Sequence, residues 1–189
     1  MSKKLDKILV IDVEATCWDS QPPEGQFSEI IEIGLCVLET KTKERIAKES
    51  FLVKPVVSKI SPFCSQLTTL TQSQVDRGMS LKEACKILEK KYISQDYTWA
   101  SYGDYDRRQF ERECQEKNIA YPFTATHINI KNLLAITQGW ERERGMASAL
   151  EKLGLPLEGT HHRGGDDAWN VANILRWILD GYVQHNRSI

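Results

Sequence analysis

Residues 8–16 read Ile8-Leu9-Val10-Ile11-Asp12-Val13-Glu14-Ala15-Thr16. Apolar, β-branched residues predict a buried strand here, which two carboxylates, Asp12 and Glu14, interrupt near its end. Side chains two positions apart on a strand point to the same face, so the two acids lie side by side and repel each other. A buried strand tolerates such a pair when a cation lies between them, and hard oxygen ligands favour a divalent one.

The pattern around this stretch predicts three strands in a meander, followed by strands that alternate with helices. The predicted strands are 7–14, 29–39, 45–53, 97–102 and 126–130. Residues 80–83 form a capping box that starts a helix, and further helices are predicted at 106–117, 145–153 and 166–179. This order favours an α/β layer fold with a mixed sheet.

Length and charge limit the classes of function. The 189 residues fit one domain, and no repeat or linker divides them. With 25 Lys and Arg against 26 Asp and Glu, the chain lacks the excess of positive charge typical of a long duplex-binding surface. A short nucleic-acid end remains a possible ligand because bound metal ions can supply positive charge.

The five cysteines are scattered, their number is odd, and none forms a Cys-x-x-Cys pair. This argues against a zinc ribbon or a disulfide framework and favours free thiols in a reducing cytosol. No apolar run reaches membrane-spanning length, and residues 1–7 lack a signal-peptide core. We therefore expect a cytoplasmic protein with no membrane partner.

Two later segments offer partners for the acidic pair. In Ser101-Tyr102-Gly103-Asp104-Tyr105-Asp106-Arg107-Arg108 a strand ends and a helix begins. Both aspartates suit a helix N-cap or first turn. One of them can cap the helix while the other directs its carboxylate to the end of the first strand.

The second segment is His161-His162-Arg163-Gly164-Gly165-Asp166-Asp167-Ala168. Its glycine pair precedes a predicted helix and allows close approach of the backbone. Asp166 and Asp167 lie at the helix start, where capping is the alternative role, and His162 alone could be an exposed loop residue. Adjacent histidines also bind zinc, but no cysteine cluster supports that metal.

Together these segments supply several carboxylates and one histidine at the ends of secondary-structure elements. An oxygen-rich set favours Mg²⁺ or Mn²⁺, and two such ions roughly 3.5–4 Å apart promote phosphodiester cleavage. A neutral imidazole near its working pKa can take a proton from the attacking water. We therefore expect a metal-dependent enzyme that acts on phosphodiesters.

The chain resembles the DEDDh 3′–5′ exonucleases of the DnaQ-like superfamily. Residues 12–16 match its first motif, Tyr105-Asp106 its second, and 162–167 its third, a His and an Asp separated by four residues. The resemblance implies two Mg²⁺ or Mn²⁺ ions held by Asp12, Glu14, Asp106 and Asp167, with His162 rather than His161 as general base. Asp104 and Asp166 are then neighbours of the site.

The sequences of residues 12–18, 29–34 and 67–72 are similar to those of the Eri/KapD-like branch of this superfamily, which includes RNA-trimming enzymes. The resemblance implies an RNase H-like fold: a mixed five-stranded sheet with the first strand central and helices on both faces. It implies a single exonuclease domain over 1–189. The implied reaction releases nucleoside 5′-monophosphates from a nucleic acid 3′ end, RNA more than single-stranded DNA.

Two positions depart from the pattern of the family. Glycines occupy the middle of the third motif at 164 and 165, where larger residues are frequent, and this predicts a mobile His162. Tyr102 stands where an Asn often precedes the second-motif Asp, which bears on substrate positioning.

Other residues are candidates for binding the terminal nucleotide. Trp18 and Tyr102 can stack on a base or simply pack in the core. Glu32 can support a metal-bound water or the terminal sugar, or face solvent. The full candidate set is Ala15, Thr16, Trp18, Glu32, Leu67, Thr68 and Tyr102.

Other functions remain open at this stage. A catalytically weak module of the same fold could hold RNA or a protein partner in the same cleft. A metal-dependent phosphatase, an endonuclease and a proofreading-type DNA exonuclease would use similar carboxylates.

Overall fold

A computed structural model of the chain describes residues 4–124 and 126–186. Residues 1–3, which belong to the N-terminal stretch examined for a signal peptide, lie outside this part, as do residues 187–189 of the predicted domain. Among the described residues, no helix is both long and apolar enough to cross a membrane.

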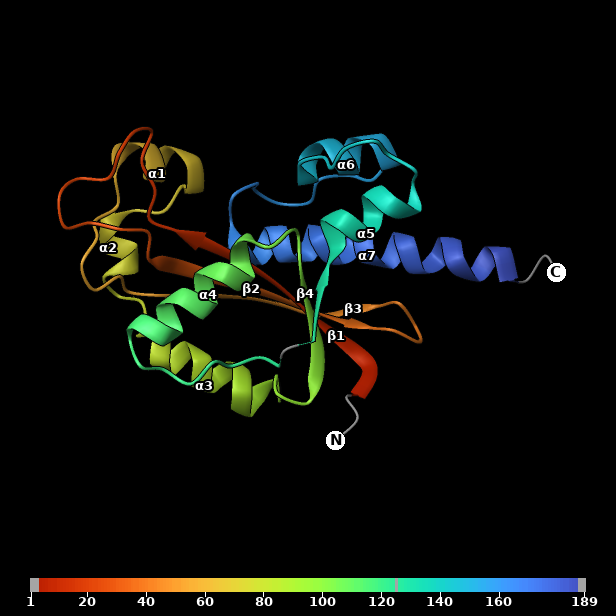
Figure 1. Cartoon of the computed structure of the whole chain (residues 1–189), viewed down its shortest axis with the longest axis horizontal. Coiled ribbons are helices and arrows are strands. Elements are labelled where there is room, and N and C mark those ends of the chain that lie inside the picture. The colour runs from red at the N-terminus through yellow and green to blue at the C-terminus, as the bar shows by residue number, and fades with distance from the viewer. Residues whose placement is uncertain (1–3, 125, 187–189) are drawn as a thin grey trace.

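Five strands form one mixed sheet (Figure 1). They are β1 (Lys4–Ala15), β2 (Ile30–Glu39), β3 (Arg45–Leu52), β4 (Tyr97–Ser101) and β5 (His127–Asn129). The spatial order is β3-β2-β1-β4-β5. β1 is antiparallel to β2 and parallel to β4, so the apolar run at residues 8–11 lies in the centre of the sheet, as predicted.

Helices cover both faces of the sheet, which confirms the predicted layers (Figure 1). They are α1 (Pro62–Thr68), α2 (Gln72–Val75), α3 (Leu81–Lys91), α4 (Tyr105–Glu116), α5 (Ile130–Thr137), α6 (Met146–Leu153) and α7 (Gly164–Asn186). One apolar core lies between the sheet and α3 and α4, and the other between the sheet and α5, α6 and α7.

Alternate residues of β1 enter opposite cores. Leu9, Ile11 and Val13 pack with α3 and α4, whereas Ile8 and Val10 pack with α7. Because a strand has a period of two, Asp12 and Glu14 continue the row of Ile8 and Val10. The acidic pair therefore lies on the face of the sheet that α7 covers.

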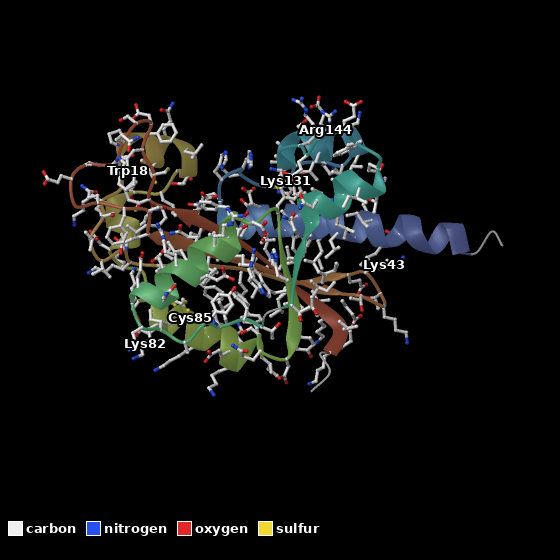
Figure 2. The ribbon with its side chains drawn as sticks, viewed as in Figure 1. Trp18, Lys43, Lys82, Cys85, Lys131 and Arg144 are labelled. Atoms are coloured by element: carbon white, nitrogen blue, oxygen red, sulfur yellow. The ribbon has the colours of Figure 1, made fainter. Side chains whose placement is uncertain are left out.

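α3 illustrates the amphipathic pattern that predicted it. Cys85 points into the core between α3 and the sheet, and Lys82 of the same helix points outward (Figure 2). Ser80 and Glu83 form the predicted capping box. All five cysteines are free thiols.

The predicted elements differ from the observed ones in several respects. α1, α2 and α5 have no counterpart among the predicted helices, and Ile130, predicted to end the fifth strand, instead begins α5. α7 begins at Gly164 rather than at residue 166, so the glycine pair lies inside its first turn.

Candidate active site

Three carboxylates converge where β1 passes under the start of α7. Oxygen atoms of Asp12, Glu14 and Asp167 all lie within 4.8 Å of one another. Glu14 is 8% exposed and Asp167 is 4% exposed. The sequence separates β1 from Asp167 by about 150 residues, so the fold itself brings these acids together.

The glycines of α7 place Asp167 against the sheet. A Cβ atom on Gly34 of β2 would lie 1.8 Å from the carbonyl oxygen of Gly164, and one on Gly165 would lie 3.0 Å from the carbonyl oxygen of Glu49. Only residues without side chains let the helix start approach β2 and β3 this closely. The glycine pair, from which a mobile His162 is predicted, thus has a packing role.

Asp106 joins the acids from the first turn of α4. Its Oδ1 accepts a hydrogen bond of 2.9 Å from the backbone N–H of Val13, the residue between Asp12 and Glu14. Asp104 occupies the N-cap position but its side chain makes no capping hydrogen bond, and it pairs with Arg107 at 3.4 Å. The structure thus places Asp106, rather than Asp104, beside the β1 acids.

Two further groups lie behind Asp106. The Oγ of Ser101, at the end of β4, lowers the pKa of Asp106; it donates to the carbonyl of Gly103 at 2.9 Å and lies 2.8 Å from Nε2 of His127 on β5. Burial lowers the pKa of His127 to about 4, so this imidazole is neutral at neutral pH. Sequence reasoning did not identify Ser101 or His127, because nothing local marks a contact between neighbouring strand ends.

Burial, and then mutual repulsion, raise the pKa values of the acids of the site. Burial, and then repulsion from Asp106 and Glu14, raise the pKa of Asp12 well above its usual value. Burial, and then repulsion from Asp167 and Glu32, raise the pKa of Glu14 to about 8. Burial raises the pKa of Asp106 to about 6, against hydrogen bonds that lower it. A divalent cation that takes the carboxylate oxygens as ligands stabilises the ionised form of such a buried cluster. The residues therefore fit Mg²⁺ or Mn²⁺.

The adjacent histidines His161 and His162 both contact Asp167. Nδ1 of His161 lies 3.0 Å from Oδ2 of Asp167, and the backbone N–H of His162 donates to the same oxygen at 2.9 Å. The two rings stack with centroids 3.9 Å apart. Burial, and then the neighbouring His161, lower the pKa of His162. Its imidazole is therefore neutral at neutral pH and able to accept a proton.

His161 is a site residue that the motif register leaves out. The nitrogens of His161 and His162 lie within 4.8 Å of each other and of an Asp167 oxygen. The pair of adjacent histidines is the one feature of the sequence that points to His161. The sequence alone does not show which of the two rings contacts Asp167.

Asp166 faces away from this cluster. Its carboxylate forms an ion pair with Lys48 at 2.5 Å and accepts a hydrogen bond from the backbone N–H of Thr160 at 2.8 Å. It ties the start of α7 to β3 and to the preceding loop.

Glu32 is completely buried, so the alternative of a solvent-facing residue is wrong. It lies opposite Glu14 in the register of β1 and β2. Both of its carboxylate oxygens accept hydrogen bonds from protein groups, namely Arg163, the backbone N–H of Gly164 and the hydroxyl of Ser50.

The other candidate substrate-binding residues have structural contacts of their own. The hydroxyl of Thr16 donates to the carbonyl of Phe27, and that of Thr68 donates to the carbonyl of Cys64. The hydroxyl of Tyr102 donates to the carbonyl of Arg144 at 3.0 Å, and its ring packs on the α7 core. Ala15 is buried, while Trp18 and Leu67 are half-buried. Their roles in substrate binding stay predictions.

Comparison with known proteins agrees with this geometry. The RNase T family model, described as "Exonuclease", matches residues 9–175. The chain belongs to this exonuclease family. A crystal structure described as the nuclease domain of 3′hExo, a DEDDh family member, bound to rAMP, has a TM-score of 0.81 at 32% identity, covering 96% of this chain and 95% of that one. The DEDDh resemblance and the RNase H-like fold are thereby confirmed.

Two longer exonucleases are similar to this chain. Human 3′-5′ exoribonuclease 1 is 34% identical over 190 residues, covering 93% of this chain and 53% of that protein. A structure that describes 3′-end-specific recognition of the histone mRNA stem-loop by a 3′-exonuclease has a TM-score of 0.82 at 32% identity. The match covers 94% of this chain and 65% of that one. The chain thus spans about half the length of the curated relative. The predicted exonuclease class is confirmed at the level of this family.

Proposed function

We propose that this exonuclease removes nucleotides from the 3′ end of RNA, releasing nucleoside 5′-monophosphates with the help of two Mg²⁺ or Mn²⁺ ions. The observation that carries the proposal is the convergence of Asp12, Glu14 and Asp167 within 4.8 Å, with Asp106 anchored beside them on the backbone of Val13. A buried acidic cluster of this kind is unfavourable on its own and favourable around cations.

Each residue of the cluster has a proposed role. The carboxylates of Asp12, Glu14, Asp106 and Asp167 hold the ions, which when bound stabilise charge on the attacking and leaving oxygens. His162, neutral because burial lowers its pKa, takes the proton from the attacking water. His161 restricts the orientation of Asp167 through their contact of 3.0 Å.

The similar proteins favour RNA as the substrate class, and the net charge favours a strand end over a long duplex. The similar proteins include one named an exoribonuclease and one described in a complex with rAMP. The formal net charge of −1 suits a short contact with a strand end better than tracking along a duplex. We also keep a single exonuclease domain and a cytoplasmic location as proposals.

The test is hydrolysis of matched RNA and DNA oligonucleotides, labelled at the 5′ end, with Mg²⁺ or Mn²⁺. We expect stepwise shortening, release of 5′-monophosphates, and faster loss of RNA. An oligonucleotide with a blocked 3′ end should resist. Asp12→Asn should raise the activation free energy by about 3 kcal/mol, which lowers the rate roughly a hundredfold or more. The fold should be retained.

The alternatives predict other outcomes. Binding without hydrolysis by the wild-type protein would indicate a binding module. Cleavage of the blocked oligonucleotide would indicate an endonuclease, and faster loss of DNA would indicate a proofreading-type enzyme. Full activity of Asp12→Asn would refute the assignment of the metal ligands.

A further inference from the structure

Glu32 is a buried carboxylate whose donors come from separate parts of the chain. Its Oε2 accepts from Nε of Arg163 at 3.1 Å and from the backbone N–H of Gly164 at 2.9 Å. Its Oε1 accepts from Nη2 of Arg163 at 3.0 Å and from the hydroxyl of Ser50 on β3. We call these four residues the Glu32 clamp. With four donors on two oxygens, little acceptor capacity remains for a substrate hydroxyl.

The clamp holds the two residues that directly follow His162. Arg163 precedes α7, and its carbonyl accepts the hydrogen bond of 2.8 Å from the backbone N–H of Asp167. Gly164 is the first residue of the helix. Glu32 thus satisfies a free N–H group at the helix start and places negative charge there, which the helix dipole favours.

His162 needs such support because of its backbone. Its φ of 64° is in the left-handed region, which is unfavourable for residues other than glycine and persists only where the surroundings enforce it. On one side its N–H bonds to Asp167, and on the other the clamp fixes Arg163 and Gly164 to β2.

From these contacts we propose that Glu32 is a positioning residue, which fixes His162 and Asp167 in their working geometry through Arg163 and Gly164. The inference rests on the proposed exonuclease function but assigns Glu32 a role different from substrate binding. A displacement of a catalytic group by about 1 Å can cost on the order of a hundredfold in rate.

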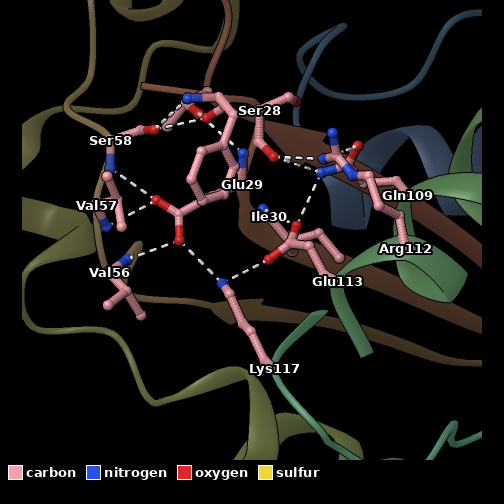
Figure 3. A network of polar contacts seen from close by, with 12 residues as sticks. Ser28, Glu29, Ile30, Val56, Val57, Ser58, Gln109, Arg112, Glu113 and Lys117 are labelled. Atoms are coloured by element: carbon pink, nitrogen blue, oxygen red, sulfur yellow. Dashed lines mark hydrogen bonds and ion pairs between the residues drawn. The ribbon is translucent and has the colours of Figure 1, made fainter. Parts of the chain in front are cut away.

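The test compares Glu32→Gln with a matched control, Glu113→Gln. Glu113 is also fully buried and accepts from Lys117 at 2.7 Å, the N–H of Ile30 at 2.6 Å and Gln109 at 2.8 Å (Figure 3). It lies near the other end of α4 from Asp106. Both substitutions remove one buried charge, so a purely structural effect should be similar in the two variants.

For Glu32→Gln we expect kcat on an RNA oligonucleotide with Mg²⁺ to fall roughly 10- to 100-fold, with KM within about twofold of the wild-type value. Glu113→Gln should keep both constants. Arg163→Gln should match Glu32→Gln, and the double variant should lose no more than either single one, since the two residues act as a unit. If Glu32→Gln does not fold, the same measurements on Arg163→Gln, a change at a partly exposed residue, decide the question.

A second readout does not depend on hydrolysis. Amide hydrogen exchange in the segment 160–168 should be faster in Glu32→Gln and Arg163→Gln than in the wild type, and unchanged in Glu113→Gln. Normal kcat in Glu32→Gln, or a raised KM with effects additive to those of Arg163→Gln, would overturn the inference. If the wild type hydrolyses nothing but the exchange results hold, the proposed function fails and the clamp stands.

Discussion

At the scale of single residues, His162 combines the properties expected of a general base. Its imidazole is half-buried next to His161, and both the burial and this neighbour lower its pKa. The backbone N–H of His162, and not a nitrogen of its ring, donates the hydrogen bond to Asp167. A ring nitrogen is therefore free for proton transfer.

His162→Ala should lower kcat by roughly 10²- to 10⁴-fold, the usual contribution of a general base. The Mn²⁺ concentration for half-maximal binding should change little, because the proposed metal ligands are the four carboxylates. Kinetics and calorimetric titration measure the two quantities on the same preparation. A loss of metal affinity as large as the loss of rate would make His162 a ligand instead of a base.

Single residues also show what the sequence can and cannot reveal. Asp12 and Glu14 could be identified because a period of two in a buried strand makes an acidic pair conspicuous. The contacts of Glu32 with Arg163 and of Ser101 with His127 join residues far apart in the chain or on neighbouring strands. Such pairs depend on tertiary packing, which no local pattern encodes.

At the scale of elements, α7 and β2 meet through glycine. The backbone of Gly164 lies where a side chain of Gly34 would be, and this contact sets the height of Asp167 above the sheet. The sequence patterns place the start of this helix two residues late, because glycines disfavour helices in isolation. Here the packing on β2 outweighs that preference.

Gly34→Ala should therefore destabilise the fold by about 3 kcal/mol, since its Cβ would meet backbone rather than a flexible side chain. Chemical denaturation measures this free energy of unfolding. The control is Gly181→Ala in α7, where a Cβ meets nothing within 4 Å. It should be neutral or stabilising by about 0.5–1 kcal/mol. Equal effects of the two substitutions would contradict the proposed contact.

The unpredicted helices have two causes. α1 and α2 are short, at seven and four residues, and their stability comes from packing more than from periodicity. α5 follows β5 directly, with Asn129 ending the strand and capping the helix, so one apolar run contributes to both elements. The longer amphipathic helices α3 and α4 were predicted within a residue or two.

At the scale of the whole molecule, the acidic site couples stability to pH and metal. Burial raises the pKa of Glu14 from 4.5 to about 8, so between these pH values the metal-free folded protein binds a proton that the unfolded chain does not. The contribution of this group to the free energy of unfolding therefore falls as pH rises through that window. Asp12 and Asp106, whose pKa values are also raised, act in the same direction.

Mg²⁺ should reverse this loss, because ligation requires ionised carboxylates and is opposed by protons. At pH 8 the ion displaces fewer protons from the acids than at pH 5.5, where Glu14 is almost fully protonated. We therefore expect Mg²⁺ to raise Tm more at pH 8 than at pH 5.5, with about 2.7 kcal/mol of stabilisation when its concentration is a hundred times Kd. Calorimetry at constant ionic strength measures both shifts. Asp12→Asn, which removes one ligand, should show little response at either pH; a response equal to that of the wild type would place the metal elsewhere.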